Sequence, residues 1–454
     1  MTAPASRPRP ARRALDELSL PVDASLLDTL TPGEPDWLVA DRRAAFEAWS
    51  RLPGESNLLY TPYIDLRAAQ LEEATVLVDR PSGSAETDAT GLPSDADAII
   101  EITEGRVKTL AVSDAAATIG LRPLTDDLDA VRAELLAIDA LIPDDKFAQL
   151  TRALWSQGVL VDVPAGVTLA KPIVVRWALG APGRALLTRT IVRLGEGASS
   201  SIVEEFVPAA GSDAAAAQSF FAGTMEVTLG HDATLQVASL QELPANVVAI
   251  QHRAASLGEA ATLQWALAQL GGRLVRSRVD NRLVGDRSSV RQVEIVFGAE
   301  EQLFDLTSYT THIGKDTTGD LLSKAALLEK SRTYLKGLIT IERSANGTDS
   351  FLGEFGMNLS KAARSVAIPS LEIDQPDCRR AAHSSSVGPI DETQLFYLES
   401  RGIPPDEARK VIVLGFLEPV VARVALASAQ DRLRELLEEK WVAGTDGVAG
   451  EAAA

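Results

Sequence analysis

A degenerate repeat in the middle of the chain constrains the fold more than any other feature. Each of its four units has a glycine, two or three polar or small residues, and then a stretch in which apolar and polar residues alternate. The glycines are Gly195, Gly230, Gly258 and Gly285, spaced by 35, 28 and 27 residues. One such unit cannot bury its apolar face alone, whereas stacked units can. The repeat therefore favours a mainly β fold, a β-solenoid, over a β-sandwich with similar hairpins.

Helical patterns flank this β region on both sides. The sequence predicts a disordered tail over residues 1–13, an N-terminal helical and mixed domain over 14–155, a solenoid core over 156–380, a C-terminal helical domain over 381–445 and a disordered tail over 446–454. The two end coils of a solenoid leave strand edges and apolar faces uncovered. We expect the flanking helices to cap these ends, and an edge left free to be a dimerisation surface.

The charge and the hydropathy of the sequence limit the cellular location and the classes of partner that we expect. The first residues are basic and proline-rich with no apolar stretch behind them, so they are not expected to be a signal peptide. No apolar run approaches the ~20 residues of a membrane span. The formal net charge of −19 repels phosphate groups, so neither nucleic acid nor an anionic membrane is an expected partner. These features predict a cytoplasmic protein.

Residues that could carry chemistry are few. The chain has one cysteine, Cys378, which excludes a disulfide framework and a self-contained zinc or iron–sulfur site rich in thiolate. His231, His252 and His312 are scattered along the β region and are predicted to be surface or core residues. P-loop, G-x-G-x-x-G, HExxH and GxSxG motifs are absent, so we assign no catalytic residue. The fold could still assemble a carboxylate cluster, which keeps a polysaccharide lyase-like or hydrolase-like solenoid enzyme as an alternative.

The junction between the β region and the C-terminal helices is the most specific part of the sequence. The segment HSSSVGPIDETQLFYLESRGIPPDEARKVIVLGF, which begins at His383, resembles the C-terminal signature of the SufB/SufD family, the scaffold subunits of Suf iron–sulfur cluster assembly. The segments LLYTPYIDL at 58–66 and PSLEI at 369–373 also fit, so the resemblance covers most of the chain. It implies a right-handed parallel β-helix core flanked by N-terminal and C-terminal helical regions, in agreement with the repeat.

The resemblance also implies a function without enzymatic activity. The chain would be a scaffold subunit of a SufBCD complex, in which a SufB-like and a SufD-like subunit pair through their β-helices and each binds a SufC-like ATPase through its C-terminal helices. SufB-like chains are expected to carry a cluster-binding cysteine late in the β-helix and a glutamate after the matching histidine. Here the only cysteine lies at the junction and Ser384 follows His383, so the chain is more similar to SufD members. A SufB-like homodimeric scaffold is the alternative within the family.

Individual residues acquire roles from the same resemblance. His383 matches the family histidine at the SufB interface and is the candidate metal ligand, since a neutral imidazole can replace thiolate at iron. Cys378 is a possible second ligand, although better-known members place a cysteine at the position of Ala381. The chain alone is expected to hold no stable cofactor, and the iron–sulfur cluster would be transient at the subunit interface. The SufC-docking candidates are Arg401, Gly402, Ile403, Pro404, Arg409, Leu414 and Phe416.

Overall fold

A computed structural model describes most of the chain, namely residues 14–78, 91–126, 128–136, 143–213, 215–424 and 426–451. The tail predicted over 1–13 lies outside these residues, as do residues 452–454. The remainder of the second predicted tail, 446–451, instead continues helix α7. No helix among the described residues is both long enough and apolar enough to cross a membrane.

Helices lie at both ends of the chain and strands lie between them. The helices are α1 (Ser25–Leu30), α2 (Asp36–Arg51), α3 (Arg132–Leu135), α4 (Lys146–Leu154), α5 (Glu392–Ser400), α6 (Pro405–Val421) and α7 (Ala427–Glu451), with 3-10 turns η1 (Thr61–Tyr63), η3 (Asp114–Ala116) and η4 (Asp129–Val131). The strands are β1 (Thr75–Val76), β2 (Ala98–Thr103), β3 (Arg106–Val112), β4 (Gly120–Pro123), β5 (Gln157–Val163), β6 (Ile173–Leu179), β7 (Arg184–Leu194), β8 (Ser199–Pro208), β9 (Ser219–Leu229), β10 (Thr234–Gln241), β11 (Val247–Leu257), β12 (Thr262–Gln269), β13 (Leu274–Leu283), β14 (Ser289–Gly298), β15 (Leu303–His312), β16 (Thr318–Leu327), β17 (Arg332–Ile341), β18 (Asp349–Asn358), β19 (Arg364–Ile373) and β20 (Arg380–Pro389).

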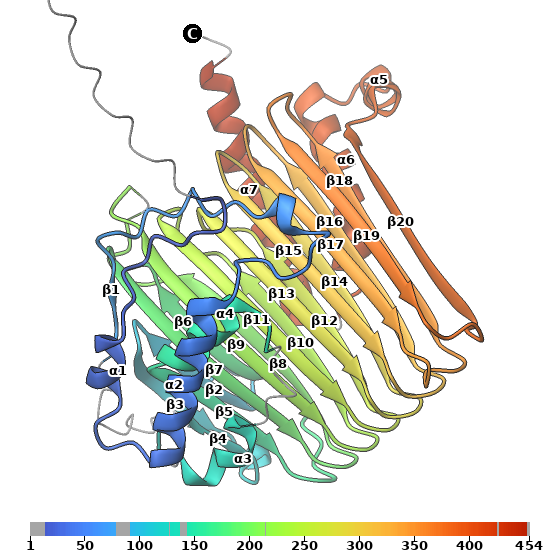
Figure 1. The fold of residues 1–454 in the computed structure, drawn as a ribbon. Coiled ribbons are helices and arrows are strands. Elements are labelled where there is room, and N and C mark those ends of the chain that lie inside the picture. Colours follow the sequence, from blue (N-terminus) through green and yellow to red (C-terminus); the bar gives the residue numbers. More distant parts are fainter. Residues whose placement is uncertain are drawn as a thin grey trace, which may run out of the picture.

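The strands form two facing sheets (Figure 1). Sheet A runs in spatial order β19-β17-β15-β13-β11-β9-β7-β5-β4, and sheet B runs β20-β18-β16-β14-β12-β10-β8-β6-β2-β3. Strands that are consecutive in the chain alternate between the sheets from β5 onward, and like strands of successive coils pair in parallel. Each pair from β5–β6 to β19–β20 is therefore one coil, and the eight coils confirm the predicted β-solenoid.

The repeat glycines lie at the same turn of successive coils, where a strand of sheet A passes into sheet B. The N–H of Gly285 donates to the carbonyl of Leu257 in the previous coil, at 2.9 Å. A Cβ placed on Gly285 would lie 2.0 Å from the backbone nitrogen of Glu259. The backbones of neighbouring turns therefore stack so closely that no side chain fits between them.

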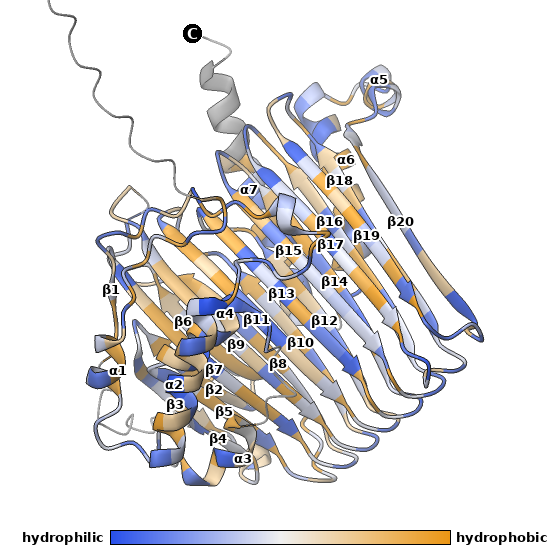
Figure 2. Cartoon of the chain, in the orientation of Figure 1, coloured by the Kyte–Doolittle hydropathy of each residue, from blue (hydrophilic) through white to orange (hydrophobic). Residues whose placement is uncertain are grey.

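Apolar residues point to both sides of most strands, and Figure 2 shows the resulting hydrophobic bands along the sheets. The inner faces form one core between the sheets. The outer face of sheet A packs against N-terminal residues such as Phe147 and Leu150 of α4. The outer face of sheet B packs against Val413 and Leu417 of α6 and against α7. Strands buried on both faces are typical of parallel sheets.

The predicted end caps are wrong, because the flanking helices cover the outer faces of the sheets and not the ends of the solenoid. At the first end, β4 pairs antiparallel with β5 and β3 pairs antiparallel with β2. At the other end, β19 and β20 each have one partner strand, so each leaves one edge unpaired among the described residues. The β core also continues to Pro389, past the predicted boundary at residue 380, and helix begins at Glu392.

Glu354 of β18 is a buried carboxyl in the interior of the last coils. Its side chain is 2% exposed, and its Oε2 accepts the N–H of Ile368 at 2.9 Å. Burial raises the pKa of Glu354 to about 8, the Ile368 N–H opposes that shift, and the carboxyl of Glu294 adds to it. The folded chain thus holds this proton at a pH at which the unfolded chain has lost it.

The stacked turns predict a large cost for Gly285→Ala. The added Cβ must displace backbone atoms of the previous coil, and overpacking of this kind costs about 1–3 kcal/mol or more. The matched control is Gly415→Ala in α6, where a Cβ meets nothing within 4 Å and alanine favours helix by roughly 1 kcal/mol over glycine. Chemical denaturation of both variants tests this. Equal stabilities would contradict the close stacking of the turns.

Glu354→Gln should change how stability depends on pH. The raised pKa contributes stability that is fully present below the unfolded pKa of about 4.5 and is lost as the pH rises through about 8. The neutral amide removes this loss, so the variant should be close to the wild type near pH 5 and exceed it at pH 8 by roughly 4 kcal/mol. Denaturation at both pH values measures this, with the exposed Glu399→Gln as control. An equal gain in the free energy of unfolding at both pH values would show that the titration of Glu354 is not the cause.

Candidate functional site

The unpaired end of the solenoid carries the histidine that the sequence singled out. His383 lies on β20, where its backbone is paired with Leu352 of β18. Paired residues of parallel strands point to the same side, and Leu352 is buried in the interior. His383 therefore points toward the interior side of sheet B, but it is exposed because no further coil follows. The imidazole is open to whatever adds to this edge.

Cys378 lies in the turn that leads into β20. Contacts with the two preceding coils hold this turn, since the N–H of Gly347 donates to the carbonyl of Asp377 at 2.9 Å and Arg379 pairs with Asp316 of the coil before that. Cys378 is half-buried and packs against an interior cluster that includes Ile341. Its position is that of a small apolar residue. Cys378 and His383 lie at different points of the last coil. No interaction joins them in the part of the chain that the structure describes.

The remaining histidines do not lie on the edge strands β19 and β20. His231 is exposed in a turn near Glu196 and Asp232. His252 is buried, with its Nε2 at 2.7 Å from Asp280. His312 is buried between two hydroxyl groups, and burial lowers its pKa to about 4. Within the described residues, no group of three or more His, Cys, Asp or Glu side chains is arranged to hold a metal ion.

Helix α5 projects from the end of the solenoid (Figure 1). Its N-terminus is capped by Asp391, whose side chain accepts the N–H of Thr393, and Gly402 follows it at φ 87°. None of its residues is buried, and Phe396 and Tyr397 are 71% and 55% exposed. The guanidinium of Arg401 lies over the Tyr397 ring at 5.1 Å. An aromatic surface of this kind on an unpacked helix is available to a partner.

The docking candidates on α6 divide into two groups. Arg409 is exposed, whereas Leu414 and Phe416 are half-buried against the outer face of sheet B. Lys324 of β16 fixes this part of the helix, because its ammonium donates to the Phe416 carbonyl at 2.6 Å and lies 4.5 Å from the ring. The ion pair of Arg423 with Asp320, at 3.2 Å, adds a second connection. The start of α6 is thus the accessible part.

Sequence reasoning missed a groove beside these helices. Its volume is about 710 Å³, and it lies between the ends of β16, β18 and β20, the start of α6 and the side of α7. The lining includes Leu359, Ile390, Arg409 and Trp441. No sequence signal identifies it, because it forms only when the C-terminal helices fold back along sheet B.

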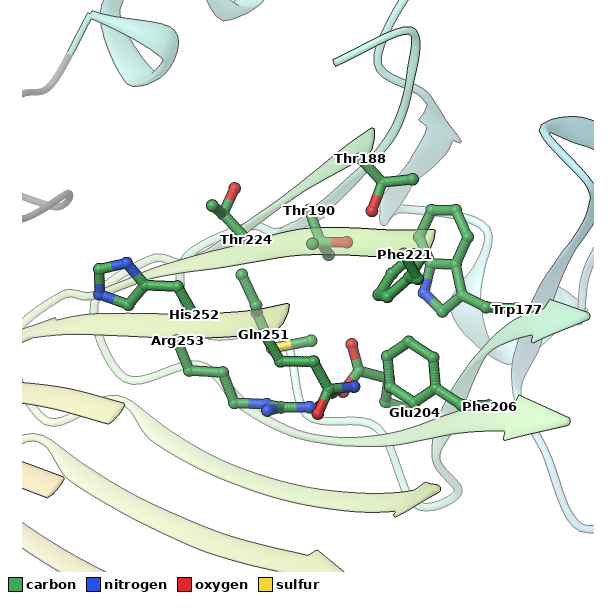
Figure 3. Close-up of a pocket in the computed structure, with 12 residues that line it drawn as sticks. Trp177, Thr188, Thr190, Glu204, Phe206, Phe221, Thr224, Gln251, His252 and Arg253 are labelled. Carbon is green, nitrogen blue, oxygen red and sulfur yellow. Dashed lines mark hydrogen bonds and ion pairs between the residues drawn. The ribbon is translucent and has the colours of Figure 1, made fainter. Parts of the chain in front are cut away.

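The interior of the solenoid holds a much smaller space between β6, β7, β8, β9 and β11. Its cavity of about 10 Å³, shown in Figure 3, has room for about one water molecule. Arg253 and Glu204 point toward each other there, at 2.5 Å, whereas His252 points the opposite way. A polymer or metabolite does not fit this cavity.

A row of carboxylates beside basic residues was the feature expected of a solenoid enzyme, and such a row exists on the outer face of sheet A. It is covered by the N-terminal region, and none of its paired side chains is more than 7% exposed. A substrate has no access to it, so it serves to hold the N-terminal region on the sheet. Its members are Glu55, Asp145, Asp280, Asp305, Arg276, Arg278 and Lys336.

Comparisons with known proteins agree with this architecture. A family model described as SUF system FeS cluster assembly, SufBD core domain, matches residues 178–416, from the end of β6 in the first coil to α6. The chain is 27% identical to iron-sulfur cluster assembly protein SufD of Bacillus subtilis (strain 168), over 69% of this chain and 70% of that protein. It is 27% identical to an iron-sulfur cluster assembly SufBD family protein of Staphylococcus epidermidis, over 64% of this chain and 62% of that protein. A Staphylococcus aureus (strain USA300) protein of the same description is 26% identical over the same shares, so less than two thirds of each staphylococcal protein is matched.

Proposed function

This chain belongs to the SufBD family of iron–sulfur cluster assembly proteins, and from that premise we propose that it is a SufD-like scaffold subunit of a SufBCD complex. The observation that carries the proposal is the open last coil, which presents His383 at an unpaired sheet edge. Unpaired edges are templates for pairing with strands of another chain. A SufB-like subunit would pair its own last coil with β19 and β20.

The cluster under assembly would be the cargo of the complex. His383 supplies one nitrogen ligand, which a neutral imidazole can offer to iron. The other ligands come from the SufB-like subunit, and a site divided between two chains is easily dismantled, which suits a scaffold that transfers its cluster. Cys378 would have to leave its apolar cluster beside Ile341 to bind iron. We therefore assign the ligand role to His383 and a packing role to Cys378.

The energy source would be a SufC-like ATPase. The sequence has no P-loop of its own. The exposed surface of α5 and the start of α6, with Phe396, Tyr397, Arg401 and Arg409, has the aromatic and arginine composition of protein interfaces. We assign SufC docking to these residues, whereas Leu414 and Phe416 act by packing α6 on sheet B. The chain itself is a scaffold and not an enzyme.

His383→Ala should lower the yield of assembled cluster and leave the complex intact. Even outer-shell partners of metal ligands contribute roughly 10–100-fold to metal affinity, so loss of a direct ligand should reduce the yield by about tenfold or more. The complex is isolated from its native cytoplasm, reconstituted anaerobically, and its visible iron–sulfur absorbance is compared with that of the wild type. The control is His231→Ala, because His231 is an exposed histidine in a distant turn.

Three results would count against parts of this proposal. An unchanged yield in an intact complex makes His383 a structural interface residue. The absence of SufB-like and SufC-like chains from the purified material removes the SufD-like assignment. A homodimer that assembles clusters without a SufB-like chain favours the SufB-like scaffold.

A further inference from the structure

Two leucines in the N-terminal region are more exposed than an apolar residue in a folded chain usually is. Leu58 and Leu59 are 85% and 53% exposed, and Leu58 is the most exposed large apolar residue in the described part of the chain. They begin the segment 58–66, in which Tyr60, Ile64 and Leu66 are buried and Tyr63 is half-buried. Contiguous exposed apolar side chains indicate an interaction site when their positions are fixed.

The backbone of these leucines is fixed on both sides. Before them, the Asn57 side chain accepts the Leu59 N–H at 3.0 Å and donates to the Tyr309 hydroxyl of β15 at 3.3 Å. After them, the Thr61 hydroxyl donates to the Leu58 carbonyl at 3.1 Å. Glu55 ties the preceding residues to Arg276 of β13 at 2.9 Å. The backbone of the leucines is thus held in place, so little backbone entropy would be lost when a partner covers them.

The position of this loop is beside the unpaired end of sheet A. The chain crosses the outer face of the sheet over β13, β15 and β17, and Tyr63 lies 6.0 Å from Tyr334 of β17. Tyr60 follows the same path, since its ring lies 5.7 Å from the ammonium of Lys336 of β17, and β17 is the strand that pairs with β19. The two leucines directly precede Tyr60. They therefore continue the open edge of the last coil as an exposed apolar surface.

We propose that Leu58 and Leu59 form an apolar contact with the SufB-like subunit that pairs with β19 and β20, so that the subunit interface extends onto the N-terminal loop. This inference rests on the proposed function. A chain that aligns its strands along β19 comes next to the loop, and burying two leucines there adds hydrophobic stabilisation to the backbone pairing. A lipid surface is disfavoured as the occupant, since the net charge of −19 repels anionic headgroups.

The first test measures the affinity of the purified chain for its purified cognate SufB-like subunit. Leu58→Asp and Leu59→Asp would place a charge in an apolar contact, so each should weaken binding by about tenfold or more, and the double variant should weaken it further. The control is Val112→Asp on β3, at the opposite end of the solenoid, where the side chain is 39% exposed. It should bind as the wild type does, and equal thermal unfolding temperatures would show that all variants fold.

The second test follows protection of the loop. In a Cys378→Ser background, Leu58→Cys introduces the only thiol, and its rate of reaction with a soluble maleimide is measured with and without the SufB-like subunit. Binding should slow the reaction at least about tenfold, whereas Val112→Cys in the same background should react at an unchanged rate. Wild-type affinity of both aspartate variants, or unprotected Leu58→Cys in the complex, overturns the loop contact and leaves the proposed function standing. If the wild-type chain does not bind the SufB-like subunit at all, the loop contact and the proposed function fail together. If Leu58→Cys is protected only when the chain associates with itself, the loop contacts a second copy of this chain instead.

Discussion

Each coil of this β-helix satisfies its backbone hydrogen-bonding groups through the coils on either side of it, and the rest of the structure depends on that constraint. The glycine turns bring neighbouring coils so close that Gly285 has no space for a Cβ. Such stacking can repeat without limit until something closes the end. Here antiparallel strands close one end and leave β19 and β20 open at the other. His383, the histidine that the resemblance singled out, lies on one of these open edge strands.

The outer faces of both sheets contribute to the hydrophobic core as the interior does. They are apolar enough to need covering, and the two ends of the chain cover one face each. On sheet A this cover also buries charges, because Arg276 and Arg278 are neutralised by Glu55 and Asp145 of the N-terminal region and by Asp305 and Asp280 of the sheet. Removing one partner of a buried pair leaves an uncompensated charge, which is costly. The N-terminal region is therefore held in one position on the sheet.

The sequence was informative where structure is local or periodic. The glycine spacing identified the coils, because each coil repeats the same turn. Alternation within LVRSRVDNRL placed Arg276 and Arg278 on one face of β13, but the pattern alone resembles a solvated face. Which segment covers that face is a matter of tertiary packing between distant parts of the chain. For the same reason, no sequence pattern indicated the groove beside Trp441 or the exposure of Leu58.

The site was predicted less completely than the fold. The histidine at residue 383 could be selected by resemblance, and its place on an edge strand followed from its position in the last coil. The surroundings of Cys378 could not be foreseen, since they consist of residues from β16, β17 and β18. Long-range packing therefore determines how far the Cys378 side chain is covered.

The attachment of α6 to β16 has a mechanical consequence. Lys324 bonds to α6, and Arg423 just after the helix pairs with Asp320, so both connections go to β16, the third strand from the open edge of sheet B. Strands cross-connected by in-register hydrogen bonds are stiff along the stacking direction. A displacement imposed on α5 and the start of α6 would therefore be transmitted through a rigid lever to the last coils, where a small tilt changes the separation of the open edge from anything paired with it.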